Sequence, residues 1–224
     1  MRTLKTLLPV AALAAGLAVA ASANATIFIA VSTDGGATIQ TLGSDPTNTN
    51  LVVGGMTFGA FTINNISATG AVALPDLLSS NSLNTSTLGA GTLDVYILET
   101  NLAASTDTGG FISSLTSNKL PNGWSVTEST FFDAANTGTY GAGVLLASNV
   151  FNAIGTSVIG AAANPSAPYA LTEQYHIVAS GNGTANSTID IASVPEPATW
   201  GLMIVGFGGI GAMVRGRRRQ AALA

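Results

Sequence analysis

The chain of 224 residues contains no cysteine, one histidine and seven lysine or arginine residues. Because no disulfide can form, a stable domain has to rest on a hydrophobic core, and the residues from Thr26 to Val194 are numerous enough to build one. A Ser-His-Asp catalytic site would have to be built around His176 alone, and the sequence has no G-x-S-x-G elbow. We therefore expect one domain without catalytic activity.

Positive charge is nearly missing from the middle of the chain. Arg2 and Lys5 lie near the N-terminus and four arginines lie near the C-terminus, so Lys119 is the only basic residue between Thr26 and Val194. Ten acidic residues lie in the same range and give it a net charge of −9. Binding to nucleic acid through phosphates needs clustered lysine and arginine, and so does adhesion to an anionic membrane surface. The composition excludes both for this region.

The N-terminus has the organisation of an export signal. Two basic residues precede an apolar run over residues 7–20, and Ala21 to Ala25 offer overlapping small-x-small cleavage sites. This order is typical of a secretory signal peptide, to which we assign residues 1–25. The alternative, a buried helix of a soluble domain, does not explain the basic flank or the alanine-rich end.

The C-terminus carries a second apolar segment. Pro195 and Pro197 hold the tripeptide Pro195-Glu196-Pro197 out of a helix, because each proline fixes its own φ and extends the residue before it. Residues 198–214 carry no charge and would reach roughly 25 Å as a helix, just enough to cross a hydrocarbon core of about 30 Å. Trp200 lies where an interfacial aromatic residue is expected. We predict a single transmembrane helix over residues 198–214.

A basic end follows this segment over residues 215–219. It consists of Arg215, Arg217, Arg218 and Arg219. By the positive-inside rule these arginines anchor their end in the cytoplasm. The body of the protein then lies outside, exported across the inner membrane.

The order of tripeptide, tryptophan, glycine-rich span and arginine cluster resembles the tail of the PEP-CTERM proteins of Gram-negative bacteria, in the PEPxxWA variant. The resemblance covers Val194 to Arg219, and Gly201 stands where the variant usually has alanine. In that family the tail is a sorting signal that a membrane-embedded exosortase cuts near the tripeptide, releasing or re-attaching the ectodomain. The resemblance implies exosortase as a partner and assigns the sorting and processing motif to Pro195, Glu196, Pro197 and Trp200. The same tail is also called an ice-binding-protein C-terminal domain, but the chain has only scattered Thr-x-Thr pieces and no regular ladder of them.

Glycines in the apolar segment satisfy the G-x-G-x-x-G spacing of a dinucleotide-binding loop between Gly206 and Gly211. That loop needs an acidic residue about twenty positions further on, and no acidic residue follows in this chain. We interpret the small residues as a closely packing face of the membrane helix, formed by Gly206, Gly208, Gly211 and Ala212. We expect no cofactor and no metal.

Between the two ends, short apolar runs alternate with turns rich in Gly, Asn, Ser and Thr. Leu93, Val95 and Ile97 alternate with polar residues, a period of two that is typical of a strand with one buried face. The segment 34–36 favours a tight hairpin. We predict an all-β ectodomain over residues 26–193, a β-sandwich resembling a jelly roll, before a sorting domain over 194–219. The expected strands are 26–32, 37–42, 56–63, 93–97, 124–132, 169–177 and 187–191.

Two segments are ambiguous between strand and helix. The apolar positions of Val144 to Ile154 also fit a three-turn helix. Leu74 to Leu83 opens at Pro75 and could hold a short helix. The sequence alone does not decide between the two structures.

Few side chains suggest chemistry. We interpret His176 as an exposed strand histidine and Lys119 as part of a solvated turn. Glycoside hydrolysis needs two carboxylates in one cleft. Glu99, Glu128 and Glu173 are the candidates, but each stands alone in the sequence.

Calcium is a second possibility for the acidic side chains. Asp34, Asp45, Asn48 and Asn50 are oxygen ligands on loops near one another in sequence. Their spacing fits neither an EF-hand nor a glycine-aspartate repeat. Solvated turns are therefore the favoured interpretation.

Taken together, the sequence predicts a surface-sorted, non-enzymatic protein of the extracellular polysaccharide matrix or biofilm. It would be anchored transiently in the membrane and then lie at the cell surface or outside the cell, with extracellular polysaccharide as a further partner. The alternative is a carbohydrate-binding module or weak glycoside hydrolase on the same sandwich. That alternative needs an exposed aromatic platform, and of the candidates Trp124, Tyr96 and Tyr140 the tryptophan is more simply explained as a core residue.

Overall fold

A computed structural model describes residues 25–70, 76–103, 108–163, 165, 168–195, 201–211 and 215. Within these ranges the chain forms thirteen β-strands, all paired antiparallel, and a short helix over residues 201–211. The all-β prediction is confirmed. The strands are β1 (Thr26–Ser32), β2 (Gln40–Asp45), β3 (Leu51–Val53), β4 (Met56–Phe58), β5 (Phe61–Thr69), β6 (Asp76–Thr87), β7 (Gly91–Leu102), β8 (Thr108–Lys119), β9 (Ser125–Asp133), β10 (Val144–Phe151), β11 (Gly155–Ala161), β12 (Tyr169–Ala179) and β13 (Gly183–Pro195).

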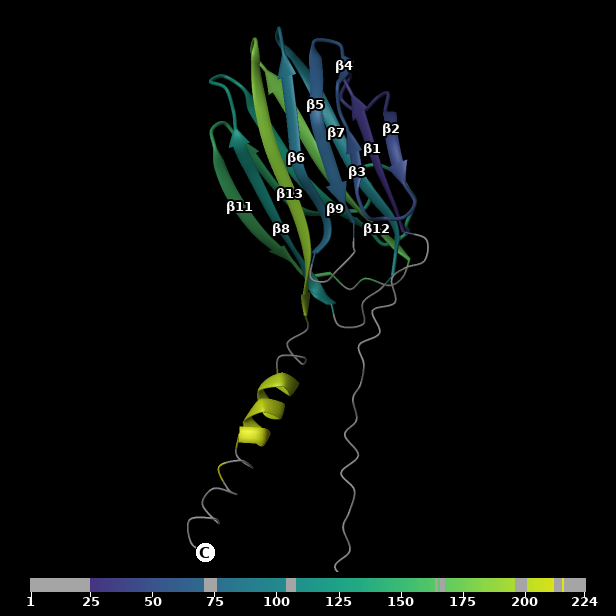
Figure 1. Cartoon of the computed structure of the whole chain (residues 1–224), viewed down its shortest axis with the longest axis vertical. Helices are drawn as coiled ribbons and strands as arrows, with labels where there is room; N and C mark the ends of the chain where they lie inside the picture. Colours follow the sequence, from purple (N-terminus) through teal and green to yellow (C-terminus); the bar gives the residue numbers. More distant parts are fainter. Residues whose placement is uncertain are drawn as a thin grey trace, which may run out of the picture.

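The strands form two sheets that lie against each other (Figure 1). Sheet A has six strands in the order β10-β9-β12-β7-β1-β2. Sheet B has seven, with β11-β8-β13-β6-β5-β3 in a row and β4 also paired with β5. From β6 to β13 the chain changes sheet at every connection except the one between β9 and β10. Neither sheet can therefore form from one continuous stretch of sequence.

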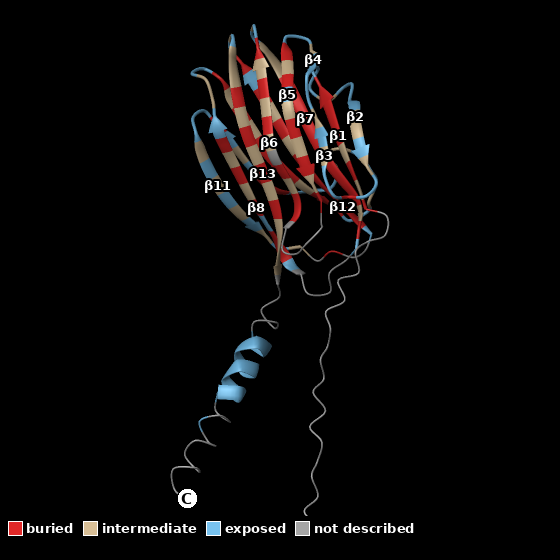
Figure 2. Ribbon diagram, viewed as in Figure 1, coloured by how far each residue is buried: buried red, intermediate tan, exposed pale blue. Residues whose placement is uncertain are grey.

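Apolar side chains from both sheets fill the space between them. Alternate residues of β7 point inward, and Leu93, Val95 and Ile97 have no exposed surface. Leu115 on β8 and Ile189 on β13 reach the same core from sheet B. Figure 2 shows the buried residues concentrated on the central strands of the sheets. Burial of each such side chain stabilises the fold by about 1.5–3 kcal/mol, which makes the packing of one sheet on the other the main source of stability.

The central strand β7 is buried on both faces, so the prediction of one buried face there is wrong. Its outward residues Asp94, Tyr96 and Leu98 are almost fully covered. Tyr140 packs on Tyr96, and His176 contacts Asp94. Loop and neighbouring-strand side chains thus cover a face that alternation alone assigns to solvent.

Both ambiguous segments are strands. Val144 to Phe151 form β10, and β6 covers most of the segment from Leu74 to Leu83. The run over residues 56–63 is not one strand but the hairpin of β4 and β5, because Gly59 turns the chain with a φ of 58°. Strands β3, β8 and β11 were not predicted, since they are short or rich in Gly, Ser and Thr.

All thirteen strands and the core residues lie between Ala25 and Pro195. A protein of residues 26–195 therefore contains the complete core and is expected to fold by itself. Strand β13 continues two residues past residue 193, the predicted end of the ectodomain. The expected signal peptide lies outside the described residues except for Ala25.

Gly143 provides a test of this packing. It has a φ of 91°, and a Cβ placed there would lie 2.1 Å from the carbonyl oxygen of Phe132. Gly138 in the same loop has a φ of 69° and open space around it. We expect Gly138→Ala to lower the free energy of unfolding of residues 26–195 by about 1–2 kcal/mol through its positive φ. Gly143→Ala should cost about 3 kcal/mol or more, because the β9–β10 pairing must also shift.

Urea denaturation of the two variants measures this difference. Equal losses would contradict the close approach of β10 to β9 at Gly143.

Candidate functional site

The C-terminal tail starts inside sheet B. In the register of β13 with β8, Ser193 lies opposite Phe111, Val194 opposite Gly110, and Pro195 opposite Thr108. The tail is thus joined to the sheet with no linker before Pro195. The other motif residues, Glu196, Pro197 and Trp200, lie outside the described part of the chain.

The helix over residues 201–211 is apolar, and its side chains are exposed. Gly206, Gly208 and Gly211 lie in it, and apart from the helix's own backbone and the neighbouring residues, no described atom lies within 4 Å of a Cβ built at any of them. Arg215 is exposed, whereas Ala212, Arg217, Arg218 and Arg219 are outside the described residues. No helix of the described ranges has the length and apolarity needed to cross a membrane. The transmembrane helix over residues 198–214 and its packing face remain predictions.

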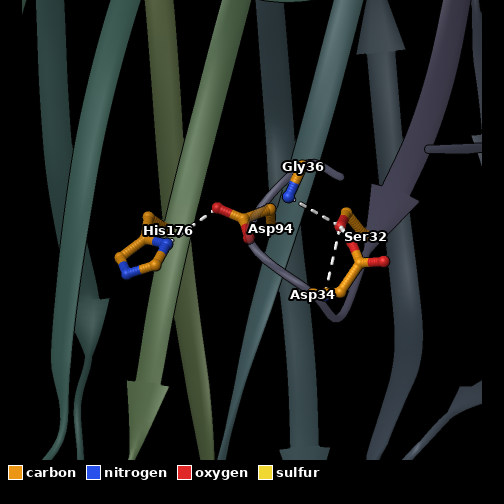
Figure 3. A network of polar contacts seen from close by, with 5 residues as sticks. All are labelled: Ser32, Asp34, Gly36, Asp94 and His176. Atoms are coloured by element: carbon orange, nitrogen blue, oxygen red, sulfur yellow. Dashed lines mark hydrogen bonds and ion pairs between the residues drawn. The ribbon is translucent and has the colours of Figure 1, made fainter. Parts of the chain in front are cut away.

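His176 forms a polar pair on the outer face of sheet A (Figure 3). It lies directly opposite Asp94 on β7, and its Nδ1 is 2.7 Å from the buried Oδ1 of that residue. On the other side of Asp94, the hydroxyl of Ser32 donates to Asp34 and accepts from the N–H of Gly36. The serine is therefore used by the turn after β1. His176 is partly exposed on the strand, and its contact with the buried Asp94 was not expected from the sequence.

A hollow of about 450 Å³ lies on the same face, beside the loop between β9 and β10. Tyr140 from this loop packs on Tyr96 with ring centroids 5.7 Å apart, and its hydroxyl is 3.0 Å from the hydroxyl of Thr41. The lining carries no aspartate, glutamate, lysine, arginine or histidine, so the hollow suits a neutral ligand. It is lined by Phe28, Thr41, Leu98, Thr100, Asn101, Asn136, Thr137, Gly138 and Tyr140.

Hydrogen bonds hold the loop beside the hollow in place. Asn101 and Asn136 both have positive φ, 58° and 50°, and bond to each other twice. The N–H of Asn101 donates to Oδ1 of Asn136 at 2.9 Å, and Nδ2 of Asn136 donates back at 2.7 Å. The carboxylate of Asp133 accepts from Ala135 and Thr137. The shape of the hollow is therefore set before any ligand arrives.

Only one of the three aromatic candidates lies at an accessible position. Trp124 is 2% exposed and packs edge-on against Phe61 in the core, as the sequence favoured. Tyr96 is 5% exposed beneath Tyr140. Tyr140, which is half-buried, is the aromatic side chain that a ligand can reach.

The three candidate glutamates lie together inside the protein. Glu99, Glu173 and Glu128 are fully buried on the adjacent strands β7, β12 and β9. Each continues the inward-facing set of its strand, as Glu173 does between Leu171 and Tyr175. That alternation was the signal that could have placed them inward. A substrate cannot reach them, so they do not form a glycosidase cleft.

Burial changes the protonation of these carboxyls. It raises the pKa of Glu128 from its ordinary value of 4.5 to about 7 and the pKa of Glu173 well above the ordinary value. Among the described residues no hydrogen bond of ordinary geometry reaches either carboxyl, nor the buried hydroxyls of Ser117 and Ser187. Neutral carboxyls suit such an interior, because burial of an unpaired charge costs far more than burial of a neutral group.

The candidate calcium ligands are divided between separate places. Asp45 pairs with Ile27 at the start of β1, whereas Asp34 follows its end, a separation of roughly 16 Å along the strand. Asp45 accepts hydrogen bonds from the loop that follows it, and Asn48 donates to the buried Glu99. In the described residues no group of three or more His, Asp or Glu side chains could hold a metal ion. The loop bonds explain these residues without an ion.

The tail matches a known sorting signal. Residues 193–219 match the PEP-CTERM protein-sorting motif, which confirms the resemblance seen in the sequence. The match includes the last strand residues from Ser193 to Pro195, so motif and sheet overlap. No curated protein matches the chain.

Three solved structures are distantly similar to the chain. The carbohydrate-binding module TmCBM61 in complex with beta-1,4-galactotriose has 9% identity and a TM-score of 0.34, with 67% of this chain and 92% of that chain covered. The K1 cleaved adhesin domain of Lys-gingipain from Porphyromonas gingivalis W83 has 8% identity and a TM-score of 0.33, with 66% and 99% covered. Tailspike protein 4 of bacteriophage CBA120 has 11% identity and a TM-score of 0.33, with 65% and 19% covered. Scores this low carry no conclusion about function.

The buried Glu128 predicts a specific dependence of stability on pH. Because its pKa is higher in the folded state, its contribution is complete below pH 4.5 and is lost as pH rises to about 7. The loss is on the order of 3 kcal/mol. Glu128→Gln should remove this part of the pH dependence in chemical unfolding of residues 26–195.

Asp45→Asn is the matched control with the opposite sign. Hydrogen bonds from Thr47 hold the pKa of Asp45 well below its ordinary value, so its contribution is lost as pH falls. The control should flatten only the acid side of the stability profile. A Glu128→Gln profile parallel to that of the wild type would show that this carboxyl is not buried as described.

Proposed function

We propose that the chain is an exported protein that an exosortase sorts to the surface of a Gram-negative cell, where its β-domain is a non-enzymatic component of the extracellular polysaccharide matrix. The observation that carries the proposal is the match of residues 193–219 to the sorting motif. The acidic ectodomain and its surface of Ser, Thr and Asn residues suit a hydrated matrix.

The polar groups of the described residues support a role without catalysis. The single histidine is paired with Asp94, and Ser32 is bonded within its own turn. The acids that could form a glycosidase pair are inside the core. The structural roles of these groups support binding and assembly, not catalysis, as the function of the domain.

The junction between β13 and the tail supports processing beyond Pro195. Backbone pairing extends to Pro195, so a cut after this residue leaves every pair of β13 with β8 intact. A cut before Ser193 would remove the pairs of Ser193, Val194 and Pro195 with β8. In this proposal residues 198–214 hold the uncut chain in the membrane, and the arginines from Arg215 to Arg219 stay in the cytoplasm.

The processing step can be tested in the host cell. A tagged chain should be shortened near Pro195 in cells that contain exosortase and remain full-length in cells that lack it. Replacement of Pro195, Glu196 and Pro197 by alanine should give the full-length product in both strains, because the enzyme recognises the tripeptide. Immunoblots of the membrane and surface fractions measure both results.

Two outcomes would be incompatible with sorting by this route. The first is identical processing in the two strains. The second is unchanged processing of the alanine variant, for which Leu88→Ala on the exposed surface of the ectodomain is the matched control.

The strand order also supports the finer fold class, a β-sandwich of the jelly-roll type. The four strands β10-β9-β12-β7 face the four strands β11-β8-β13-β6. In an eight-strand jelly roll lettered B to I along the chain, these are the orders F-E-H-C and G-D-I-B. Strands β1 to β5 then extend both sheets at one side.

Carbohydrate binding is a second candidate function, favoured by the hollow at Tyr140. Sugars present hydroxyls at their edges and C–H groups on their faces, and the hollow offers hydroxyl and amide groups beside an aromatic ring. It carries no charge, and its loop is held by the bonds between Asn101 and Asn136. Neutral glycans therefore suit it better than acidic ones.

A glycan array with residues 26–195 tests this candidate. We expect saturable binding to neutral glycans that Tyr140→Ala weakens about tenfold or more, because the aromatic face is lost. Tyr140→Phe keeps the ring and removes only the hydroxyl that contacts Thr41, so it should retain most of the affinity. Equal binding by the alanine variant, with an unchanged unfolding curve, would exclude the hollow as the binding site.

A further inference from the structure

Each sheet ends in strands whose outer backbone groups have no strand partner within the described chain. These edges are β10 and β2 in sheet A, and β11 and β3 with β4 in sheet B. An open edge can add a strand from another molecule, and soluble proteins usually block it by short length, charge, proline or a bulge. The four edges of this protein differ in which of these features they have.

Three edges are blocked. Strand β10 has an irregularity between Leu145 and Ala147, and β2 has one opposite Ile29 and Ala30 and also ends in Asp45. Strands β3 and β4 have only three residues each. A bulge bends the edge away from an incoming strand, and a three-residue strand offers too few hydrogen bonds.

Strand β11 has none of these protections. Its seven residues pair with β8 from Ser117 to Phe111 without a shift in register. It contains neither proline nor charge, and no charged residue occurs anywhere from residue 134 to residue 172. Val158 at its centre is 64% exposed.

The inner face of β11 is also incompletely covered. Ser157, Ile159 and Ala161 point toward the core but are only half-buried. On the neighbouring strand β8, Leu115 at the same layer has no exposed surface. Another strand beside β11 would cover these side chains in the way that β11 covers those of β8.

From these observations we infer that β11 pairs antiparallel with β11 of a second copy of this chain. The ectodomain has a net charge of −9, so two copies repel each other over most of their surfaces. The uncharged β11 edge is a place where they can approach. With a two-fold axis at Val158, one contact pairs the open β11 edges of both copies. If β11 paired with a different strand, the β11 edge of the second copy would stay open.

Such a pair joins two copies of sheet B into one continuous sheet. The contact needs no residue of the tail and none of the hollow at Tyr140. It would therefore form equally before and after processing, and it goes beyond the proposed sorting function.

Single cysteines test the contact in the full chain, which has no native cysteine. In a symmetric pair the two Val158 side chains lie opposite each other, with Cβ atoms about 4.5–5.5 Å apart, near the spacing of a disulfide. Val158→Cys should give disulfide-linked dimers under mild oxidation. Val52→Cys is the matched control, because Val52 is 56% exposed on the three-residue edge strand β3. This variant should stay mostly monomeric.

A second variant separates strand pairing from random collision. Thr156→Lys, added to Val158→Cys, places a charge on the exposed side of β11 and should lower the dimer yield roughly fivefold or more. Three results would overturn the inference: no dimer from Val158→Cys, equal dimer yields at positions 158 and 52, or a cross-linked product whose mass is not twice that of the chain. Intact-mass measurement of the products decides among them.

Discussion

The packing of two antiparallel sheets on each other is the constraint on which the other features depend. From β6 to β13 the chain changes sheet at every connection but one, and β13 adds Ala185, Ile189 and Ile191 to the core, so the core is not complete until β13 is in place. That strand lies between β6 and β8 and also carries the first residues of the sorting motif. The segment that completes the fold is thus the one that leads to the tail, which ties processing of the tail to the integrity of the domain.

Acidic residues have two different roles in this fold. Glu99, Glu128 and Glu173 lie inside, where burial raises the pKa of the last two and favours their neutral forms. Asp34 lies in the turn after β1 and Asp45 ends β2, and hydrogen bonds from the adjacent turns lower their pKa values. The net charge counted from the sequence therefore overstates the negative charge of the folded domain near neutral pH. Asp34 and Asp45, whose lowered pKa values keep them ionised, lie near the two ends of β1.

Much of the fold could be predicted from alternation and turn residues, as β1, β9 and β12 demonstrate. Strands β8 and β11 are rich in glycine and serine and lack a clear apolar alternation, so the sequence did not predict them. On β8 only Phe111 and Leu115 carry large apolar side chains into the core. Contacts between residues far apart in the chain could not be predicted from the sequence. In the folded chain His176 contacts Asp94, and Asn101 contacts Asn136. Glu99, Glu128 and Glu173 are buried together on three adjacent strands. The sorting motif could be recognised from the sequence, because its residues follow one another in the chain.

The central claim is that the sorting motif overlaps the last strand and that processing leaves this strand whole. Intact-mass analysis of the mature protein recovered from the cell surface tests it most directly. The account predicts a C-terminus at Pro195 or a few residues beyond it, on a protein that unfolds at the same temperature as residues 26–195. A mature protein that ends before Ser193, or that still carries the arginines after residue 214, would contradict it.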